Sequence, residues 1–304
     1  MRYLPLTVFL LATLFAGSQA RMFEPGLISN GGVFGFTLSP DGREAFFVFS
    51  NGGRDTMQLY HTVKRGKRWS KPQPWRWADA RQRQIDPAFS PDGNTLLLNI
   101  NGPGTRSFDI FASRRTDSGW SNPEPVAAVN SDSSDFFATM SRSGTIYFTR
   151  RLDGRNQVHV SRLRNGAYTL PVPLDSVVNG LPGGATNPFI DPDERYLLFH
   201  VSERPGVGDL YVSWRGDAGW TAPVALGSEV NSPISEFCPF VHGPGGYLYF
   251  ARTEVQPGGR RTENIWRIRV KKVQALRKRP GNSFASPLLS FRKPSAFGRF
   301  ELIL

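Results

Sequence analysis

The sequence has only one cysteine among its 304 residues, which excludes an intramolecular disulfide. That residue, Cys238, lies in the apolar stretch Phe237-Cys238-Pro239-Phe240, which favours a small buried hydrophobe over a nucleophile. Histidine is also scarce, and the four copies lack the spacing of zinc ligands: His61, His159, His200 and His242. We therefore expect no metal site built from these side chains.

Several catalytic and nucleotide-binding motifs are missing as well. The chain has no Gly-x-Ser-x-Gly, no P-loop and no Rossmann glycine pattern, and Gly102-Pro103-Gly104 is typical of an ordinary loop. No amphipathic helical run stands out, whereas 31 Gly, 24 Pro and 12% aromatic residues suit many short strands joined by tight turns. The composition predicts an all-β protein.

Acidic residues are outnumbered by basic ones, 25 to 37, so the formal charge is +12. The excess is concentrated after residue 270, where one acid, Glu301, faces eight cations: Lys271, Lys272, Arg277, Lys278, Arg279, Arg292, Lys293 and Arg299. We expect residues 271–304 to be a largely disordered tail that either holds a polyanion, such as a membrane surface, or is merely solvated.

The first 20 residues have the layout of a secretory signal peptide. Arg2 gives a short basic start, residues 4–15 are apolar, and Ser18-Gln19-Ala20 is a small-x-small cleavage site. An uncleaved membrane anchor is the alternative. We expect a periplasmic or secreted protein with no transmembrane segment after the signal is removed, and no nucleic-acid partner, because export separates the chain from nucleic acid.

A tight turn recurs along the whole chain after this leader. Ser39-Pro40-Asp41-Gly42 returns as Ser90-Pro91-Asp92-Gly93, and weaker copies begin at residues 141, 191 and 242, so that successive starts lie 51, 51, 50 and 51 residues apart. Pro presets the first central position, Asp bonds its own backbone and Gly accepts positive φ, so the turn aspartates are expected to be structural: Asp41, Asp92 and Asp193. Five units of about 51 residues indicate a repeat architecture.

Each unit repeats the same series of strands. A short strand leads into the turn, and an apolar run such as Leu96-Leu97-Leu98 leaves it, as expected for a strand covered on both faces. A Gly/Arg/Asn-rich loop and a third strand follow. A fourth strand carries aromatic-[Ser/Thr]-x-Pro, as in Trp69-Ser70-Lys71-Pro72, and its proline confines it to the sheet edge. Four strands with the edge strand last is the plan of a propeller blade.

The ends of the chain suggest how such a ring closes. The fifth unit lacks its own aromatic-[Ser/Thr]-x-Pro, but Met22-Phe23-Glu24-Pro25 precedes the first turn, and Pro72 lies 47 residues after Pro25, close to one period. We predict a five-bladed β-propeller over residues 21–270, closed by the N-terminal strand. A six-bladed ring is the alternative, although residues 271–304 lack a turn and strand run of the right form.

The stretch Pro87-Ala88-Phe89-Ser90-Pro91-Asp92-Gly93, with the later Asp109-Ile110-Phe111, resembles the WD40-like β-propeller repeat of TolB-type exported propellers. The Gly-Trp-Ser-x-Pro form after the third strand is similar to exported bacterial propellers built from that repeat. The resemblance covers about residues 21–270; two units match closely, and the other three depart at the turn. It implies a propeller fold, whereas members range from binding scaffolds and peptidase accessory domains to a few lyases.

In a propeller, the loops between the second and third strands share one rim with the loops between blades, opposite the Pro-Asp-Gly turns. Binding usually uses that loop-rich rim and the adjacent channel mouth. Arginine suits carboxylate or phosphate capture, so this rim favours an acidic ligand, unless the arginines only solubilise the loops. The binding candidates on these loops are Arg81, Arg106, Arg155 and Arg204.

Acids and amides lie just before the innermost strands. Asp86 and Asn187 lie four residues before their turns, and Asp135 and Glu236 lie six before, so in regular strands all four face the same way. They are candidates to line the channel mouth, where a cation or a basic group would bind; satisfying local backbone donors is the alternative. No further cofactor is expected. A glycosidase-like mechanism needs a carboxylate pair, for which Asp86, Asp135 and Glu236 are weak candidates.

Tryptophan supplies the remaining candidates. Trp75 and Trp77 flank Arg76 outside the repeat pattern, which fits an exposed binding hot spot. The repeated tryptophans are expected to pack between blades instead: Trp69, Trp120 and Trp220. Our main hypothesis is an exported, monomeric, non-catalytic scaffold that binds an envelope protein or an acidic or carbohydrate ligand. The alternative is a carbohydrate-active hydrolase or lyase that uses acids at the channel mouth.

Overall fold

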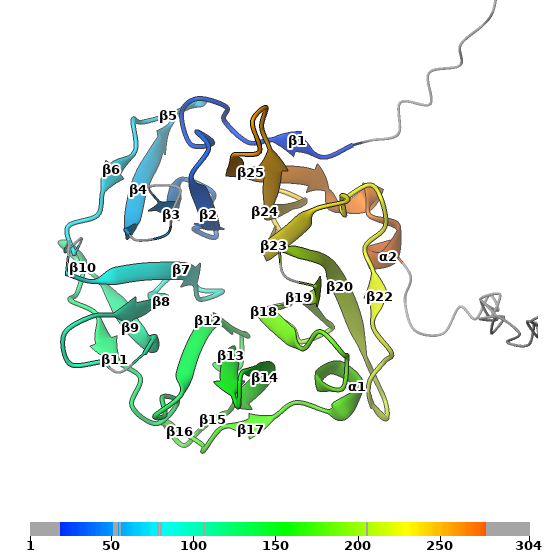
Figure 1. Ribbon diagram of the computed structural model, residues 1–304. Helices are drawn as coiled ribbons and strands as arrows, with labels where there is room; N and C mark the ends of the chain where they lie inside the picture. Colours follow the sequence, from blue (N-terminus) through cyan, green and yellow to red (C-terminus); the bar gives the residue numbers. More distant parts are fainter. Residues whose placement is uncertain are drawn as a thin grey trace, which may run out of the picture.

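The structure is a computed structural model that describes residues 19–50, 54, 56–77, 79, 81–105, 107–204 and 206–277. Within these ranges almost all regular structure is β-strand, so the protein is all-β as the composition predicts. Figure 1 shows the sheets standing around a common centre, in the arrangement of a β-propeller. No helix of the described residues is long and apolar enough to cross a membrane.

Each of the five predicted repeats begins with a strand at this centre, and we number the repeats units 1 to 5 in chain order (Figure 1). These strands are short because a turn residue follows each of them directly. The innermost strands are β2 (Val33–Leu38), β7 (Arg83–Phe89), β12 (Ser134–Met140), β18 (Ala185–Ile190) and β23 (Ser235–His242).

The second and third strands of each unit continue outward as antiparallel neighbours. The apolar runs lie in the second strands and are buried. The second strands are β3 (Glu44–Ser50), β8 (Thr95–Asn101), β13 (Ile146–Leu152), β19 (Tyr196–Arg204) and β24 (Tyr247–Val255). The third strands are β4 (Met57–Arg65), β9 (Asp109–Thr116), β14 (Arg155–Ser161), β20 (Val207–Gly216) and β25 (Arg261–Arg269).

The predicted fourth strand is broken into pairs of short pieces. Its proline lacks an N–H, so the ladder is interrupted between the aromatic residue and the segment that follows. The pieces are β5 (Arg68–Trp69) and β6 (Gln73–Pro74), β10 (Gly119–Trp120) and β11 (Glu124–Pro125), β16 (Ala167–Tyr168) and β17 (Val172–Pro173), and β21 (Gly219–Trp220) and β22 (Val224–Ala225). β15 (Leu163–Arg164) pairs with β16.

The two ends of the described chain meet at unit 5. β1 (Arg21–Met22) pairs antiparallel with β25, and the Phe23 N–H continues the ladder to the Ile265 carbonyl. After β25 the chain forms the 3₁₀ turn η1 (Val270–Lys272) and the helix α2 (Gln274–Arg277). Residues 271–277 therefore differ from the expected disordered tail, because Val273 and Leu276 are buried in one apolar cluster with Ala20. A further short helix, α1 (Ser176–Asn179), joins units 3 and 4.

The repeated turn forms as its residues predict. The Ser39 hydroxyl donates to Asp41 Oδ1, which accepts the Arg43 N–H at 3.0 Å, and the Gly42 N–H donates to the Ser39 carbonyl at 2.8 Å. The hydrogen bond from Ser39 lowers the pKa of Asp41, and Ser90 does the same for Asp92. These aspartates hold the turn.

The repeated tryptophans pack between units, as the sequence predicts. Trp120 of unit 2 lies edge-on to Phe46 of unit 1, and Trp220 of unit 4 lies edge-on to Tyr147 of unit 3. Trp69 of unit 1 contacts Phe23, beside unit 5. Each aromatic ring thus joins its own unit to the preceding one.

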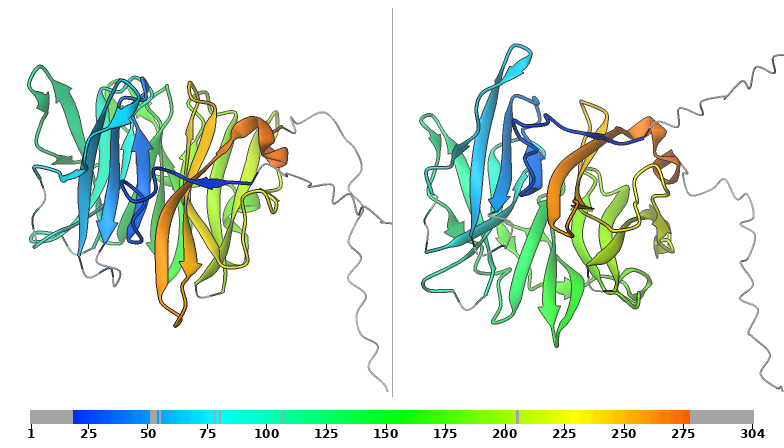
Figure 2. Two further views of the ribbon diagram at one scale, coloured as in Figure 1. Left: turned by 90° about the horizontal axis from the view of Figure 1, so that it is seen from above. Right: turned by 45° about the horizontal axis from the view of Figure 1, so that its top comes forward.

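The strands run across the thickness of the molecule, so their ends form two opposite faces (Figure 2). We call the face with the turns after the innermost strands the turn side. The opposite face, with the loops between second and third strands, is the loop side.

Candidate functional site

Each innermost strand contains a β-bulge near its middle, seen as a register shift against the second strand. In every bulge, the residue four positions before the turn has positive φ. A bulge inserts one extra residue into the strand, so the side chains beyond it point to the opposite face from the one that regular alternation would give. The positive-φ residues, with φ between 49° and 55°, are Gly35, Asp86, Phe137, Asn187 and Cys238. Positions four and six before the turn therefore do not share a face as they would in regular strands.

Asp86 lies in the bulge of β7, at the centre of the molecule. Its Oδ1 atom is 3.9 Å from Cys238 Sγ of unit 5, and it approaches Gly35 of unit 1, where a Cβ atom would come within 3.3 Å of the same oxygen. Burial raises the pKa of Asp86 to about 7, against the opposing charge of Arg54 and the hydrogen bond from Cys238. The void beside it measures about 20 Å³, enough for about one water molecule.

Asp135 and Glu236 occupy equivalent places in units 3 and 5 and are fully buried. Asp135 accepts a bond from Arg150 Nε at 2.6 Å, and Glu236 accepts one from Arg252 Nε at 2.7 Å. Asp135 Oδ2 also accepts the N–H of Ser131 at 2.8 Å. These carboxylates therefore join the loop-side ends of the innermost strands to the preceding loops. They satisfy nearby hydrogen-bond donors, which was the alternative to lining the channel mouth.

Arg54 covers the loop-side end of the centre. Its guanidinium lies 4.7 Å from the ring centroid of Phe34 and 5.4 Å from that of Phe237, and it pairs with Glu263 of unit 5. A cation over two aromatic faces and beside a carboxylate is held by both interactions. Arg54 thus lies on the loop side of Asp86, and its charge acts on that carboxyl.

The predicted binding arginines have diverse surroundings. Arg81 is exposed and pairs with its neighbour Asp79 at 2.7 Å. Arg155 donates to the carbonyls of Asn179 and Leu181, at 3.0 and 2.9 Å, and so braces the chain around α1. Arg106 lies outside the described residues, and the side chain of Arg204, in β19, does too. Arg81 and Arg155, the two whose side chains the structure describes, are thus each engaged by nearby groups of the protein.

Trp75 and Trp77 pack between units 1 and 2. Trp75 lies edge-on to Phe46 at 5.1 Å, and the two indoles are edge-on to each other at 5.5 Å. The Arg76 guanidinium lies 5.7 Å from both rings. Asn187, the amide candidate, is in the bulge of β18, where its N–H donates to Thr149 Oγ1 at 3.0 Å. These contacts serve packing and the bulge.

A large hollow lies on the turn side, opposite the rim that the sequence favours. It has a volume of about 1470 Å³ and is lined by the ends of the innermost strands and the turns of all five units. Its floor is asymmetric: units 1 to 3 contribute small residues there, whereas units 4 and 5 contribute aromatic rings. The floor residues are Thr37, Ala88, Thr139, Phe189 and Phe240.

The lip of this turn-side cavity is built from equivalent turn positions. Four of the five are Pro or Gly, and one carries a charge: Pro40, Pro91, Arg142, Pro192 and Gly243. Two contacts join neighbouring turns, since the Arg142 N–H donates to the Pro192 carbonyl at 2.7 Å and His242 Nε2 lies 3.2 Å from the Pro40 carbonyl. The sequence period already marked these positions, and only the radial arrangement shows that they surround one cavity.

Charges gather where unit 4 borders the cavity. Arg142 Nε is 3.0 Å from Asp193, and Arg195 pairs with Asp191 at 2.7 Å. Glu194 accepts the Tyr147 hydroxyl at 2.9 Å and lies 3.7 Å from Arg215. The prediction that Asp193 holds its own turn is wrong, because Asp191 Oδ2 accepts the N–H groups of Asp193 and Arg195 there, at 3.2 Å each, and Asp193 pairs with Arg142 instead.

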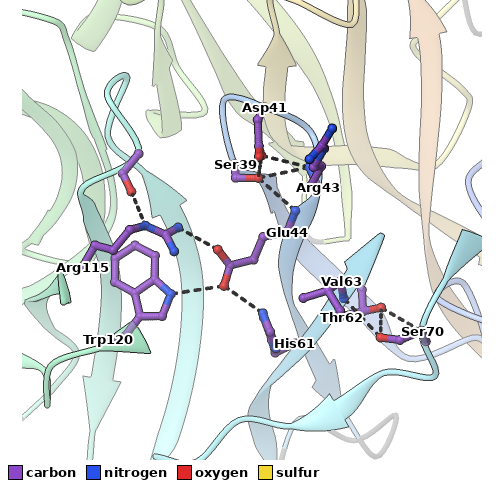
Figure 3. Close-up of polar contacts among 11 residues, drawn as sticks. Ser39, Asp41, Arg43, Glu44, His61, Thr62, Val63, Ser70, Arg115 and Trp120 are labelled. Carbon is purple, nitrogen blue, oxygen red and sulfur yellow. Dashed lines mark hydrogen bonds and ion pairs between the residues drawn. The ribbon is translucent and has the colours of Figure 1, made fainter. Parts of the chain in front are cut away.

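A separate polar cluster fastens unit 1 to unit 2 (Figure 3). The Glu44 carboxylate accepts from His61 at 2.9 Å, from Arg115 at 2.7 Å and from Trp120 Nε1 at 3.2 Å. Burial raises the pKa of Glu44, but these three hydrogen bonds outweigh it and lower the pKa to about 2. The cluster is a partly buried inter-unit contact in which these three partners of Glu44 all come from the chain.

The described residues contain no group of three or more His, Cys, Asp or Glu side chains placed to hold a metal ion. Two of the histidines that lack ligand spacing, His159 and His200, are instead enclosed by apolar neighbours, and burial lowers the pKa of each to about 4. They lie within the strands as neutral side chains.

No protein-family model and no curated protein matches the chain. Among solved structures it is similar to TolB from Acinetobacter baumannii, with 13% identity and a TM-score of 0.46, over 78% of this chain and 54% of that one. A glycoside hydrolase gives 11% identity and a TM-score of 0.49 over 92% and 96% of the two chains. A puromycin-hydrolyzing peptidase of Mycobacterium tuberculosis gives 12% and 0.44 over 78% and 34%. The chain thus spans about half of that TolB and a third of that peptidase, and at this similarity the geometry of the chain itself decides what can be inferred about its function.

Proposed function

We propose that the protein is an exported, five-bladed β-propeller that acts as a non-catalytic binding module of the cell envelope and holds its ligand in the turn-side cavity. One observation carries this proposal: a cavity of about 1470 Å³ lies where the turns of all five units converge. Ligand sites in proteins are concave, largely apolar and few in number. The export rests on the sequence of residues 1–20, of which 1–18 lie outside the described residues.

The five-bladed ring is supported by contacts at both ends of the chain. β1 supplies an outer strand to unit 5, which has no such strand of its own among the described residues. On the turn side, His242 of unit 5 reaches the Pro40 carbonyl of unit 1. Closure through an N-terminal strand removes the exposed edges that an open row of blades would leave.

The lining favours an envelope protein segment as the ligand. Rings and prolines provide apolar contact without much side-chain entropy, and charges at unit 4 supply orientation. Tyr196 and Trp214, whose ring centroids are 5.2 Å apart, extend the apolar surface away from the centre. A carbohydrate ligand would use the same rings, and the experiment below distinguishes the two.

The candidate acids support binding over catalysis. Asp135 and Glu236 are each engaged by a buried arginine, which is a structural use of a carboxylate. Asp86 has a raised pKa, as a general acid would, but it faces a void of about 20 Å³, too small for a sugar. The alternative of a glycosidase-like pair therefore has no supporting geometry in these three residues.

The experiment is a screen of the full chain against envelope proteins and envelope glycans, followed by an assay for turnover of each hit. We expect saturable binding of a protein segment without turnover. The Asp86→Asn variant should bind as the wild type does, because Asp86 lies outside the turn-side cavity. Glycan cleavage that Asp86→Asn or Asp135→Asn abolishes in a folded protein would overturn the proposal in favour of the enzyme.

A further inference from the structure

Four hairpins stand beside the turns on the turn side, between each third strand and the outer pieces. In three of them a backbone N–H on the hairpin donates to the carbonyl of a residue just after the turn: Lys64 to Arg43 at 2.7 Å, Arg115 to Asn94 at 2.9 Å and Arg215 to Arg195 at 2.9 Å. In unit 3 the side chain of Leu163 lies against Gly144 of the turn. The hairpins are equivalent places on one face, so they can be compared residue by residue.

The unit 3 hairpin differs from the others at its first position. In units 1, 2 and 4 that position holds a cation over the repeated tryptophan: Lys64 over Trp69 at 5.6 Å, Arg115 over Trp120 at 4.3 Å and Arg215 over Trp220 at 4.7 Å. Unit 3 has Leu163 and Tyr168 in these places. An apolar residue therefore stands where the repeat otherwise places a charge.

Unit 3 exposes three apolar side chains in and after this hairpin, and we call them the unit 3 edge: Leu163, Leu170 and Val172. Their exposed fractions are 39%, 84% and 46%. The position of Leu170 is Lys71, Asn122 and Ala222 in units 1, 2 and 4. A leucine that is almost wholly in water, beside two other apolar residues, marks an interaction surface more than a single exposed residue does.

The charges within the unit 3 hairpin itself all have one sign. Arg162 and Arg164 are exposed and make no ion pair with any described residue, and residues 161–174 contain no Asp or Glu. The hairpin of unit 1 is also free of acids, from residue 56 to residue 78, and exposes four cations on the same face: Arg65, Lys67, Arg68 and Lys71. The hairpins of units 2 and 4 instead carry Asp117 and Asp217.

The backbone of the unit 3 edge is unsuited to pairing with a partner strand. Pro171 directly precedes β17 and Pro173 lies in it; neither has an N–H group, so an added strand would lose ladder hydrogen bonds. β15, β16 and β17 lie at the perimeter of the molecule (Figure 1), and the three exposed apolar residues are not among those that line the turn-side cavity. Protruding apolar residues flanked by unpaired cations match the interfacial zone of an anionic bilayer.

We propose that the perimeter of the turn-side face at units 1 to 3 docks on an anionic lipid bilayer, with the molecule tilted so that the turn-side cavity and the unit 4 hairpin stay in water. The unit 3 edge inserts at the headgroup boundary, and the arginines and lysines of units 1 and 3 lie on the anionic headgroups. The proposal rests on the hairpins and stands independently of what the turn-side cavity binds. Apolar insertion and cationic attraction contribute together, as is usual for peripheral attachment.

The contact can be located with a thiol-reactive, polarity-sensitive dye on the full chain. Cys238 is buried and burial raises the pKa of its thiol, so it does not compete for the dye. The label is placed at Ala167→Cys in the unit 3 hairpin and, as the matched control, at Ala218→Cys in the unit 4 hairpin; both alanines are exposed. Vesicles of equal parts phosphatidylglycerol and phosphatidylcholine should shift the emission at position 167 to the blue, with little shift at 218 and none with phosphatidylcholine alone. Equal shifts at both positions, or no shift at 167, would overturn the proposal.

Partitioning of unlabelled variants to the same vesicles tests the two contributions separately. Leu170→Ala, which installs the residue found at the equivalent Ala222 of unit 4, should weaken partitioning about fiftyfold, because about three methylene equivalents are no longer inserted. Lys67→Glu with Arg68→Glu should weaken it by more than about thirtyfold, because two attractive charges are lost and two repulsive ones are added, and should remove most of its salt dependence. Val224→Ser, an exposed valine in the corresponding piece of unit 4, should leave partitioning unchanged. A charge-reversal effect with no effect of Leu170→Ala would show plain polyanion binding and refute insertion.

Discussion

The two ends of the molecule's centre use similar residues for opposite purposes. At the loop-side end Arg54 lies over two phenylalanines, and Asp135 and Glu236 are buried against arginines. At the turn-side end Arg142, Asp193 and Arg195 pair at the surface around a cavity of about 1470 Å³. At the loop-side end the charged side chains pair with one another or stack on rings of the protein, and so hold the strands together. At the turn-side end the charged side chains surround a cavity that has space for another molecule.

The comparison teaches that charged residues near a channel mouth are not by themselves a site. Burial decides the difference, because a buried carboxylate must be paired to be tolerated and is then committed to its partner. An exposed pair costs little to break, so its members remain available to a ligand. The predictions below test this division, beginning with the largest expected effect.

Asp135→Asn should have the largest effect on stability. It leaves the Arg150 guanidinium buried without its counter-charge, a change that costs about 3–5 kcal/mol of unfolding free energy. Denaturant unfolding followed by tryptophan fluorescence measures this loss. A variant of unchanged stability that has lost binding or turnover would show that Asp135 is a functional residue. It would contradict the view that the loop-side charges are structural.

Asp86→Asn should change stability in the opposite direction at high pH. The folded-state pKa of about 7 exceeds the ordinary value of 3.8. Between these two pH values Asp86 is protonated in the folded protein and ionised in the unfolded chain, so the free energy of unfolding of the wild type falls as pH rises from about 4 to about 7. The amide has no such penalty, and the variant should gain at most about 4 kcal/mol at pH 8 while losing this part of the pH dependence. Unfolding free energies measured at pH 4 and pH 8 for both proteins provide the test; a wild type that is more stable at pH 8 and a variant that is not would contradict it.

Glu44→Gln should weaken the contact between units 1 and 2 by about 1–3 kcal/mol, because one charged acceptor serves His61, Arg115 and Trp120. The lowered pKa of Glu44 makes this contribution fully present above about pH 4.5 and lost as pH falls toward 2. The wild type should therefore lose stability across that window more steeply than the variant. Parallel acid unfolding curves would show that the cluster contributes little.

Asp79→Asn should have the smallest effect. Its partner Arg81 is one of the predicted binding arginines, and the pair is exposed on the loop side. The unfolding midpoint and the binding of envelope proteins should both equal those of the wild type. Loss of binding would return the loop-side rim to consideration as the site.

The fold could be predicted well from the sequence because the repeat is marked by residues that act on their immediate neighbours in the chain. Ser39 and Asp41 bond the turn that contains them, and a proline in the fourth strand marks a sheet edge wherever it occurs. Such signals do not depend on distant contacts. The pairing of β1 with unit 5, where Met22 lies opposite Trp266, could also be predicted, because unit 5 lacks the fourth-strand motif that the other four units have.

The site was harder to predict because it depends on long-range geometry. The bulge that places Asp86 against Cys238 reverses the alternation on which the even spacing of the acids relied. The arginine partners of Asp135 and Glu236 lie on the neighbouring strand, 15 and 16 residues away, with no motif to mark them. The cavity arises only when five turns, ordinary one at a time, meet around one centre.

The central claim, that ligands enter from the turn side, is tested most directly by blocking each end with the same side chain. Gly243→Trp obstructs the turn-side lip, where an added Cβ meets no atom within 4 Å and φ is not positive, and Arg83→Trp puts an indole at the loop-side start of β7. The quantity to measure is the amount of envelope protein retained by each immobilised full-length variant, relative to wild type. Loss with Gly243→Trp and full retention with Arg83→Trp is the predicted result; full retention with Gly243→Trp and loss with Arg83→Trp would contradict the account.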